Sequence, residues 1–442
     1  MPNFRVIVLG AGPAGLFTAH ALAAAGIDFI VLERQPEIVR FQGALLVLWP
    51  PFVRLMDQLG LYEQVKKLST VLTTKTSFTH SGEPLSHDHI FDALEEELGY
   101  PSVGLSRGNL LHILYENLPE HKTKVRPNAH AVNIETHQDG VHVHLADGSV
   151  VDGSVVIAAD GVHSPARELI QRLGRDSPAT SDLKPTSPMV TTFMSLFGHT
   201  RGTRKDIALG DFAEGHGPGI ASQSTRLDDA IYFTVLKRLD KPTSEKRRFT
   251  SEEVDKFVRE MSDMTIFPGV KLNEIWPLRE EANATLLHQE EGLADKWYHG
   301  RVVLVGDAAH KMTSVNGQGA LSAVLSATTL VNNLRATLRQ RSGPSTEDLE
   351  AAFAKYQASR MDAAGAVQQF GGILTRFITW TDEGNEALDR EASRTQDMTE
   401  VSKNRMLPVF AQSPLLDFIP YESKQGNTPW AVDGKFLVRA RL

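Results

Sequence analysis

Residues 4–15 read Phe4-Arg5-Val6-Ile7-Val8-Leu9-Gly10-Ala11-Gly12-Pro13-Ala14-Gly15, and this stretch decides the fold of the chain. Its apolar run ends at a glycine, which is typical of a buried parallel strand. Residues 16–25 then predict a helix that ends at Gly26, and residues 27–32 predict a second strand. The sequence therefore predicts a βαβ unit whose first turn carries the Gly-x-Gly-x-x-Gly pattern of dinucleotide-binding folds.

The glycines of this pattern let backbone amides approach a pyrophosphate at the positive end of a helix. Glu33 closes the second strand, 23 positions after Gly10, where a carboxylate accepts hydrogen bonds from ribose hydroxyls. Because a carboxylate would repel a 2′-phosphate, the turn favours FAD or NAD over NADP as the bound nucleotide. The alternative is that the glycines serve only a tight packing turn.

Length and composition limit the function classes that remain. The chain has 442 residues, which suggests two or three domains. Its net charge of -8 and the lack of a long basic block argue against a nucleic-acid partner. There is no cysteine, so disulfides, thiolate metal sites and cysteine nucleophiles are excluded. No apolar run is long enough to span a membrane, and the histidine pairs lack a third ligand at metal-binding spacing.

Two further turns follow predicted buried strands. Gly306-Asp307 comes after residues 301–305, and Gly317 and Gly319 open the next helix. Asp307 is then placed to accept ribityl hydroxyls, which favours FAD over NAD, although an N-cap aspartate would look the same. Asp160-Gly161 forms the second turn, and together with Arg107 it can complete a pyrophosphate site.

These pieces, in this order and at these separations, resemble the flavoprotein monooxygenases of the aromatic-hydroxylase type, which include para-hydroxybenzoate and salicylate hydroxylases. Residues 306–312 and 37–50 are similar to fungal members of meroterpenoid and indole-alkaloid biosynthesis. The resemblance covers the chain to about residue 380. It implies an α/β fold with a Rossmann-like FAD-binding domain, a second sheet-rich substrate domain and a helical C-terminal region.

The resemblance also implies a cofactor and a reaction. FAD is expected to bind non-covalently, with NADPH or NADH as a transient reductant. In that family a flavin C4a-hydroperoxide hydroxylates or epoxidises an electron-rich carbon of a small molecule, here a secondary-metabolite intermediate. The motifs and their neighbours give the expected FAD-binding residues: Gly10, Gly12, Ala14, Gly15, Glu33, Arg34, Gly43, Ala44, Arg107, Asp160, Gly161, Gly306, Asp307, Gly317 and Gly319.

The expected substrate-contacting residues are Leu46, Val47, Met194, Leu196 and Ser314. The four apolar side chains among them carry no charge, so we expect a largely apolar substrate. Three features depart from the family: Ser314 replaces the usual proline, residues 45–47 are bulky where small residues are usual, and Met194 stands where arginine is common. Serine could loosen its loop, since it lacks the fixed φ of proline.

Bulky residues beside the flavin could also block the movement by which it meets the reductant. The second hypothesis is therefore an isomerase, cyclase or oxidase on the same scaffold that does not transfer oxygen. The third is a non-catalytic flavin-binding or ligand-binding protein.

We expect the FAD-binding domain to comprise residues 1–75, 103–176 and 284–342. The substrate domain would take residues 76–102 and 177–283, and the helical region residues 343–442. Within the first domain, residues 150–158 are expected to form one strand. No signal peptide is evident, so the expected location is cytoplasmic. The final Ala440-Arg441-Leu442 is a variant of the Ser-Lys-Leu peroxisomal signal, which makes import the alternative.

Overall fold

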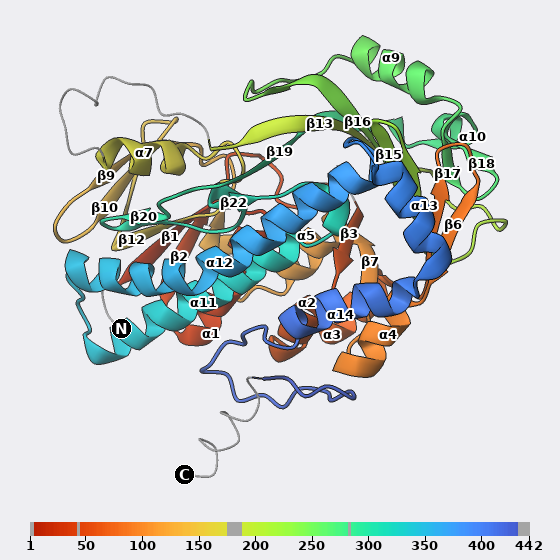
Figure 1. Ribbon diagram of the computed structural model, residues 1–442. Coiled ribbons are helices and arrows are strands. Elements are labelled where there is room, and N and C mark those ends of the chain that lie inside the picture. Colours follow the sequence, from red (N-terminus) through yellow and green to blue (C-terminus); the bar gives the residue numbers. More distant parts are fainter. Residues whose placement is uncertain (1–3, 42–44, 175–187, 282–283, 432–442) are drawn as a thin grey trace.

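The computed structural model describes residues 4–41, 45–174, 188–281 and 284–431 (Figure 1). The predicted βαβ unit is confirmed: β1 (Arg5–Leu9) and β2 (Asp28–Leu32) pair in parallel and are joined by α1 (Pro13–Ala25). They lie at the centre of a six-stranded sheet. Its remaining strands are β20 (Tyr298–His299), β21 (Val302–Leu304), β12 (Val155–Ala158) and β8 (Val125–Arg126).

The strand order of this sheet is β20-β21-β12-β1-β2-β8, and every pairing is parallel except that of β20 with β21. Residues 150–158 do not form the single strand that we expected. β11 (Val150–Gly153) instead joins β9 (Ala131–Thr136) and β10 (Val141–Leu145) in a separate antiparallel sheet. Ser154 separates β11 from β12, and its hydroxyl accepts a hydrogen bond from Arg5 N–H of β1.

A second sheet has eight strands. Its order is β22 (His310–Lys311), β19 (Thr285–Leu293), β13 (Val190–His199), β16 (Ile231–Thr243), β15 (Ile220–Arg226), β14 (Phe212–Gly217), β5 (Lys75–Thr79) and β6 (Pro84–Asp88). The boundary expected at residue 284 is one strand too early, because β19 pairs with β13 and not with the parallel sheet. A strand of mixed polar and apolar residues such as β19 cannot be assigned to one of two sheets by sequence alone.

Helices cover both faces of the second sheet. α9 (Ser251–Met261) covers one face, together with β17 (Thr265–Phe267), β18 (Val270–Lys271) and α10 (Leu272–Ile275). The other face meets the long helix α12 (Thr346–Ile378), which runs beside α11 (Gly319–Gln340) across the molecule (Figure 1). α12 therefore connects the parallel sheet with the inner face of the second sheet.

The C-terminal region is helical as expected, with α13 (Asn385–Thr395) and α14 (Met398–Phe410) after α12. The chain then packs against the start of the molecule, where Arg54 donates to Ser413 O and to the Ser423 hydroxyl. Among the residues described here, no helix is both long and apolar enough to cross a membrane.

The other α-helices and strands of the described chain are β3 (Leu45–Leu48), α2 (Pro50–Gln58), α3 (Tyr62–Leu68), β4 (Thr70–Val71), α4 (Ile90–Leu98), β7 (Val103–Ser106), α5 (Arg107–Glu116), α6 (His121–Lys124) and α7 (Pro165–Leu173).

The first turn depends on two glycines for different reasons. Gly10 has a φ of 95°, which a residue with a Cβ rarely adopts. Gly15 has no such constraint, but a Cβ built on it would lie 1.9 Å from the carbonyl oxygen of Gly10. The turn can close onto α1 only because this position has no side chain.

We expect Gly15→Ala to lower the free energy of unfolding of the ligand-free protein by about 1–3 kcal/mol, since the backbone of Gly10 must move to admit a methyl group. Urea unfolding followed by circular dichroism measures the change. Gly343→Ala is the matched control, because a Cβ there would meet no atom within 4 Å. Equal stability of the two variants would show that the turn is not tightly closed.

Candidate functional site

The main cavity has a volume of about 1150 Å³ and begins where four parallel strands end. Leu9, Leu32, Ala159 and Val305 line it, at the carboxyl ends of β1, β2, β12 and β21. It continues past β3 to the inner face of the second sheet and to α12, α13 and α14. Ligands of open parallel sheets bind at this edge, where strand order reverses.

Glu33 lies at the nucleotide end of the cavity and is buried. Its carboxylate accepts hydrogen bonds from the backbone N–H of Ala11 at 2.8 Å and of Gln35 at 3.0 Å. These bonds fix the carboxylate beside the glycine turn. A carboxylate has about four acceptor sites, so Glu33 can still accept from the hydroxyl groups of a ribose.

Two guanidinium groups face the same part of the cavity. Burial and the positive charge of Arg40 both lower the pKa of Arg107 from its ordinary value, while Glu33 and Asp307 oppose the shift. A Cβ on Gly12 would lie 4.0 Å from the Arg107 guanidinium, so the turn and this side chain enclose one space. Two neighbouring cations at a helix N-terminus make a site for a pyrophosphate, whose negative charge would relieve their repulsion.

Asp160 supplies a further polar atom that lacks a protein partner. Its Oδ2 accepts a weak hydrogen bond from the Ala166 N–H at 3.3 Å, but Oδ1 is buried with no partner. Burial raises the pKa of this carboxyl, against hydrogen bonds from Ser164 and the α7 backbone that lower it. A buried polar atom without a partner is costly, so Asp160 fits a bound group with hydroxyl donors, as FAD has.

The structure brings most of the predicted cofactor residues to this cavity. Gly15 and Gly306 do not line it; a Cβ on Gly306 would lie 3.1 Å from the Cβ atoms of Ala14 and Ala323, so this glycine serves helix packing. Gly43 and Ala44 lie outside the described residues. The predicted residues that line the cavity are Gly10, Gly12, Ala14, Glu33, Arg34, Arg107, Asp160, Gly161, Asp307, Gly317 and Gly319.

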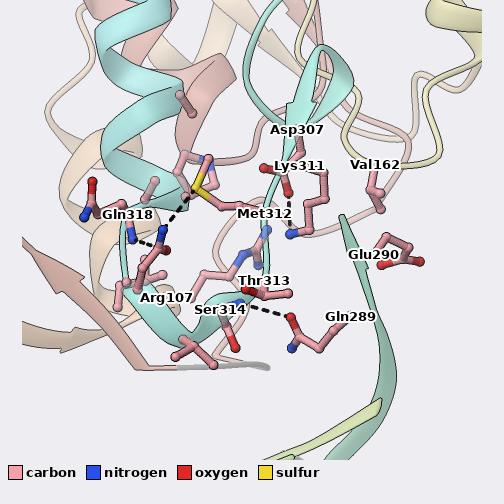
Figure 2. A pocket seen from close by; sticks show the side chains of 18 of the residues that line it. Arg107, Val162, Gln289, Glu290, Asp307, Lys311, Met312, Thr313, Ser314 and Gln318 are labelled. Atoms are coloured by element: carbon pink, nitrogen blue, oxygen red, sulfur yellow. Dashed lines mark hydrogen bonds and ion pairs between the residues drawn. The ribbon is translucent and has the colours of Figure 1, made fainter. Parts of the chain in front are cut away.

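The loop after Gly306-Asp307 is held on several sides (Figure 2). Lys311 Nζ lies 2.9 Å from Asp307 Oδ2, and Ser314 N–H donates to Gln289 Oε1 at 3.1 Å. The Asn316 side chain donates to the Val367 carbonyl oxygen. The expectation that serine loosens this loop is therefore not met, because its N–H, which proline lacks, ties the loop to β19.

Leu46, Val47 and Ser314 line the cavity as predicted, whereas Met194 and Leu196 do not. Successive side chains of a strand point to opposite faces. Leu196 and Met194 pack in the cluster under α9, which includes Phe257 of that helix. The prediction for these two residues is wrong by one position of register, and Phe197 of the same strand lines the cavity instead.

A cluster of buried charged side chains, which no sequence motif predicts, lies at the far end of the cavity. His216 donates to Asp389 Oδ2 at 2.6 Å and to Glu214 Oε1 at 3.1 Å, so both ring nitrogens face carboxylates. Lys75 Nζ lies 2.6 Å from Glu214 Oε1, and Trp380 Nε1 donates to Asp389 at 2.8 Å. These residues come from β5, β14, α12's end and α13, and no spacing in the sequence connects them. We call Lys75, Glu214, His216 and Asp389 the charged cluster.

Electrostatics in the charged cluster favour a charged histidine. Burial opposes the imidazolium, but hydrogen bonds to Asp389 and Glu214 outweigh it and raise the pKa of His216. Burial likewise opposes ionisation of Glu214, yet Lys75 and His216 hold the pKa of its carboxyl well below the usual range. Burial raises the pKa of the nearby Asp88 despite the positive charge of Lys75.

A pH dependence of stability follows from the raised pKa of His216. Its contribution is complete below the unfolded-state pKa of about 6.5 and is lost as the pH rises through the higher folded-state pKa. We therefore expect the free energy of unfolding to decline above pH 6.5 more steeply in the native protein than in His216→Gln. Urea unfolding between pH 5.5 and 9 measures both slopes.

The control is His142→Gln, since His142 pairs with Asp152 on an exposed hairpin and leaves the charged cluster intact. This variant should keep the pH slope of the native protein. Identical slopes in the native protein and His216→Gln would mean that His216 is neutral in the folded state.

Comparisons with known proteins agree with this geometry. A family model described as an FAD binding domain matches residues 3–370. The chain is 36% identical to FAD-dependent monooxygenase srdH of Neurospora crassa, over 97% of this chain and 99% of that protein. It is 32% identical to FAD-dependent monooxygenase paxM of Penicillium paxilli, over 85% of this chain and 79% of that protein.

Among solved structures, HpxO of Klebsiella pneumoniae in complex with FAD and uric acid superimposes with a TM-score of 0.76. The match covers 93% of this chain and 97% of HpxO at 23% identity, so it shows a shared fold. The matched FAD-binding domain and the full-length similarity to srdH lead to one conclusion: this chain belongs to the FAD-dependent monooxygenases, a family of flavoprotein oxidoreductases.

Proposed function

We propose that this enzyme uses NADPH or NADH and O2 to hydroxylate or epoxidise a largely apolar intermediate of secondary metabolism. One observation carries the proposal: a single cavity runs from the glycine turn and the two arginines to the inner face of the second sheet. A cofactor held at one end can therefore meet a small molecule held at the other. No second Gly-x-Gly-x-x-Gly motif occurs in the sequence, which fits a reductant that binds only transiently.

The residues of the nucleotide end would hold FAD in an extended form. Glu33 would accept from its ribose, Arg107 and Arg40 would face its pyrophosphate, and Asp307 would accept from its ribityl chain. Bound FAD would supply the redox chemistry, with two electrons from the nicotinamide and O2 as the oxygen source, so that one oxygen atom goes to the substrate and the other leaves as water. The chain's own residues position both molecules and exclude water from the site.

The substrate end offers chiefly apolar contact area. Leu46 and Val47 of β3 lie on the side of the cofactor, and Phe197 and Leu287 lie on the inner face of the second sheet. Helix α12 closes the space with apolar side chains: Phe370, Ile373, Leu374, Phe377 and Ile378. HpxO, a relative in fold, is described in complex with uric acid, which supports a small-molecule substrate in this chain as well.

The loop geometry favours oxygen transfer over the isomerase, cyclase or oxidase alternative. That alternative rests on Ser314 in place of the usual proline, on the bulky residues 45–47 and on Met194, and the structure bears on the first of these. Gln289 now fixes the backbone there, and Gln223 Nε2 donates to the carbonyl oxygen of Val315 at 2.8 Å. The segment beside the expected flavin is thus ordered by side chains of the second sheet.

Glu33→Ala should weaken FAD binding by about 1–3 kcal/mol, because hydrogen bonds between a carboxylate and ribose hydroxyls are lost. This corresponds to a rise in Kd of roughly 5- to 150-fold. Titration of FAD-stripped protein by calorimetry measures it. Glu33→Gln keeps one acceptor oxygen, so its Kd for FAD should lie between those of the native protein and Glu33→Ala.

The control is Glu37→Ala, which removes an exposed carboxylate outside the cavity from the same segment. Because Glu33 also holds the backbone of Ala11, each variant needs an unfolding curve beside its Kd. If Glu33→Ala bound FAD as tightly as Glu37→Ala, the ribose would lie elsewhere.

Oxygen transfer is tested with the FAD-loaded enzyme and candidate substrates. We expect substrate to accelerate anaerobic reduction of the flavin by NADPH or NADH in stopped-flow absorbance. Admission of 18O2 should then give a product heavier by one 18O atom. An isomeric product formed without reductant or O2 would refute the monooxygenase reaction and favour the alternative.

A further inference from the structure

The charged cluster lies on the cavity wall rather than in the protein core. Lys75, Glu214, His216 and Asp389 all line the cavity, from β5, β14 and α13. The two carboxylates and the imidazole are almost fully buried, with side-chain exposures of 2%, 5% and 6%. Lys75 keeps 24% of its side-chain surface open. Of these four side chains, that of Lys75 is therefore the most open to a molecule bound in the cavity.

Lys75 has unused hydrogen-bonding capacity. A lysine ammonium carries three N–H donors and no acceptor. Within the described part of the chain, the hydrogen-bond partner of Lys75 is Glu214, which lies 2.6 Å away. At least one further N–H is therefore available to a group in the cavity, and that group must be an acceptor.

The other members hold Lys75 in place. Glu214 is fixed by His216 at 3.1 Å and by Gln223 at 2.9 Å, and Asp389 fixes the opposite nitrogen of His216. Gln223 also donates to Val315 of the loop beside the expected flavin. Burying charges in this way is costly unless every one is paired, and here each carboxylate is matched by a cation.

Charge balance limits the chemistry of the acceptor. In the charged cluster two basic side chains, Lys75 and His216, face two carboxyl groups, those of Glu214 and Asp389. Asp88, on the neighbouring β6, is held toward its neutral form because burial raises the pKa of its carboxyl. The charged cluster thus has no excess positive charge for an anion, whereas a neutral oxygen acceptor needs none.

We propose that Lys75 determines substrate specificity by donating a hydrogen bond to a neutral oxygen of the substrate, a carbonyl or hydroxyl group at the end of an otherwise apolar skeleton. Glu214, His216 and Asp389 act as positioning residues for the ammonium. This inference rests on the proposed function, since it takes the cavity as the substrate site. It corrects the expectation of a pocket lined without charge.

Equilibrium binding to the FAD-loaded enzyme tests the proposal without turnover. The probes are 4-butylphenol and 4-butylbenzaldehyde, which carry a neutral oxygen, 4-butyltoluene, which has none, and 4-butylbenzoate, which is an anion. Flavin difference spectra and tryptophan fluorescence give each Kd; Trp380 contacts Asp389 and reports on the charged cluster. We expect the phenol or the aldehyde to bind about 10-fold or more tighter than the toluene, and the benzoate to bind no tighter than the aldehyde.

Two variants separate specificity from folding. Lys75→Met alone leaves Glu214 short of a partner, so the double variant Lys75→Met/Glu214→Gln removes both charges together. It should bind phenol, aldehyde and toluene with Kd values within about 2-fold of one another, while Lys75→Arg should restore the preference. The matched control is Lys237→Met/Glu260→Gln, which removes a surface pair of equal length, 2.6 Å, between β16 of the same sheet and α9.

The outcomes are distinct from those of the oxygen-transfer experiment, because no reductant is present. A preference for the oxygen-bearing probes that survives in Lys75→Met/Glu214→Gln would overturn the role of Lys75. Equal binding of all probes to the native enzyme, or no saturable binding of the phenol and the aldehyde, would overturn it as well. Tightest binding of the benzoate would show that the site selects an anion.

Discussion

The structure depends on one close approach, that of Gly15 to the carbonyl oxygen of Gly10. Because no Cβ stands between them, α1 begins directly at the end of β1, and its first turn faces the carboxyl ends of the parallel strands. Gly306 likewise has no Cβ, which lets α1 and α11 pack close to its turn. The cavity exists at this edge because two helices can pack so close to the turns that line it.

The two ends of the cavity differ in whether their charged groups are paired within the protein. At the nucleotide end, Arg107 and Arg40 repel each other, and Asp160 Oδ1 is buried without a partner. A bound cofactor that carries a pyrophosphate and hydroxyl groups would offset both of these costs. At the substrate end the charges of the charged cluster are paired within the protein, so that it can face a largely apolar molecule without strong demand for a counter-ion.

The loop after Gly306-Asp307 connects these ends. In place of the conformational restriction of a proline, the loop donates a hydrogen bond to Gln289 and accepts one from Gln223, both of the second sheet. A shift of β15 or β19 in that sheet would therefore move the loop backbone, because the side chains of Gln223 and Gln289 join them. The same Gln223 contacts Glu214, which ties the substrate end to the loop.

Sequence alone determined the βαβ unit, its glycine turn, Glu33, Arg107 and the two aspartate turns, because these features are local: neighbouring residues set strand, turn and helix start. Tertiary structure decided what depends on register and on pairing between distant segments. Met194 and Leu196 point to α9 because an irregularity in β13 between Thr191 and Phe193 sets its alternation. Lys75, Glu214, His216 and Asp389 meet across more than 300 residues, since a sheet can bring β5 and β14 side by side and a helix can then cover them. No local pattern encodes such a meeting, because the hydrogen bonds and ion pairs that offset the cost of burying these charges form only between segments that the assembled fold brings together.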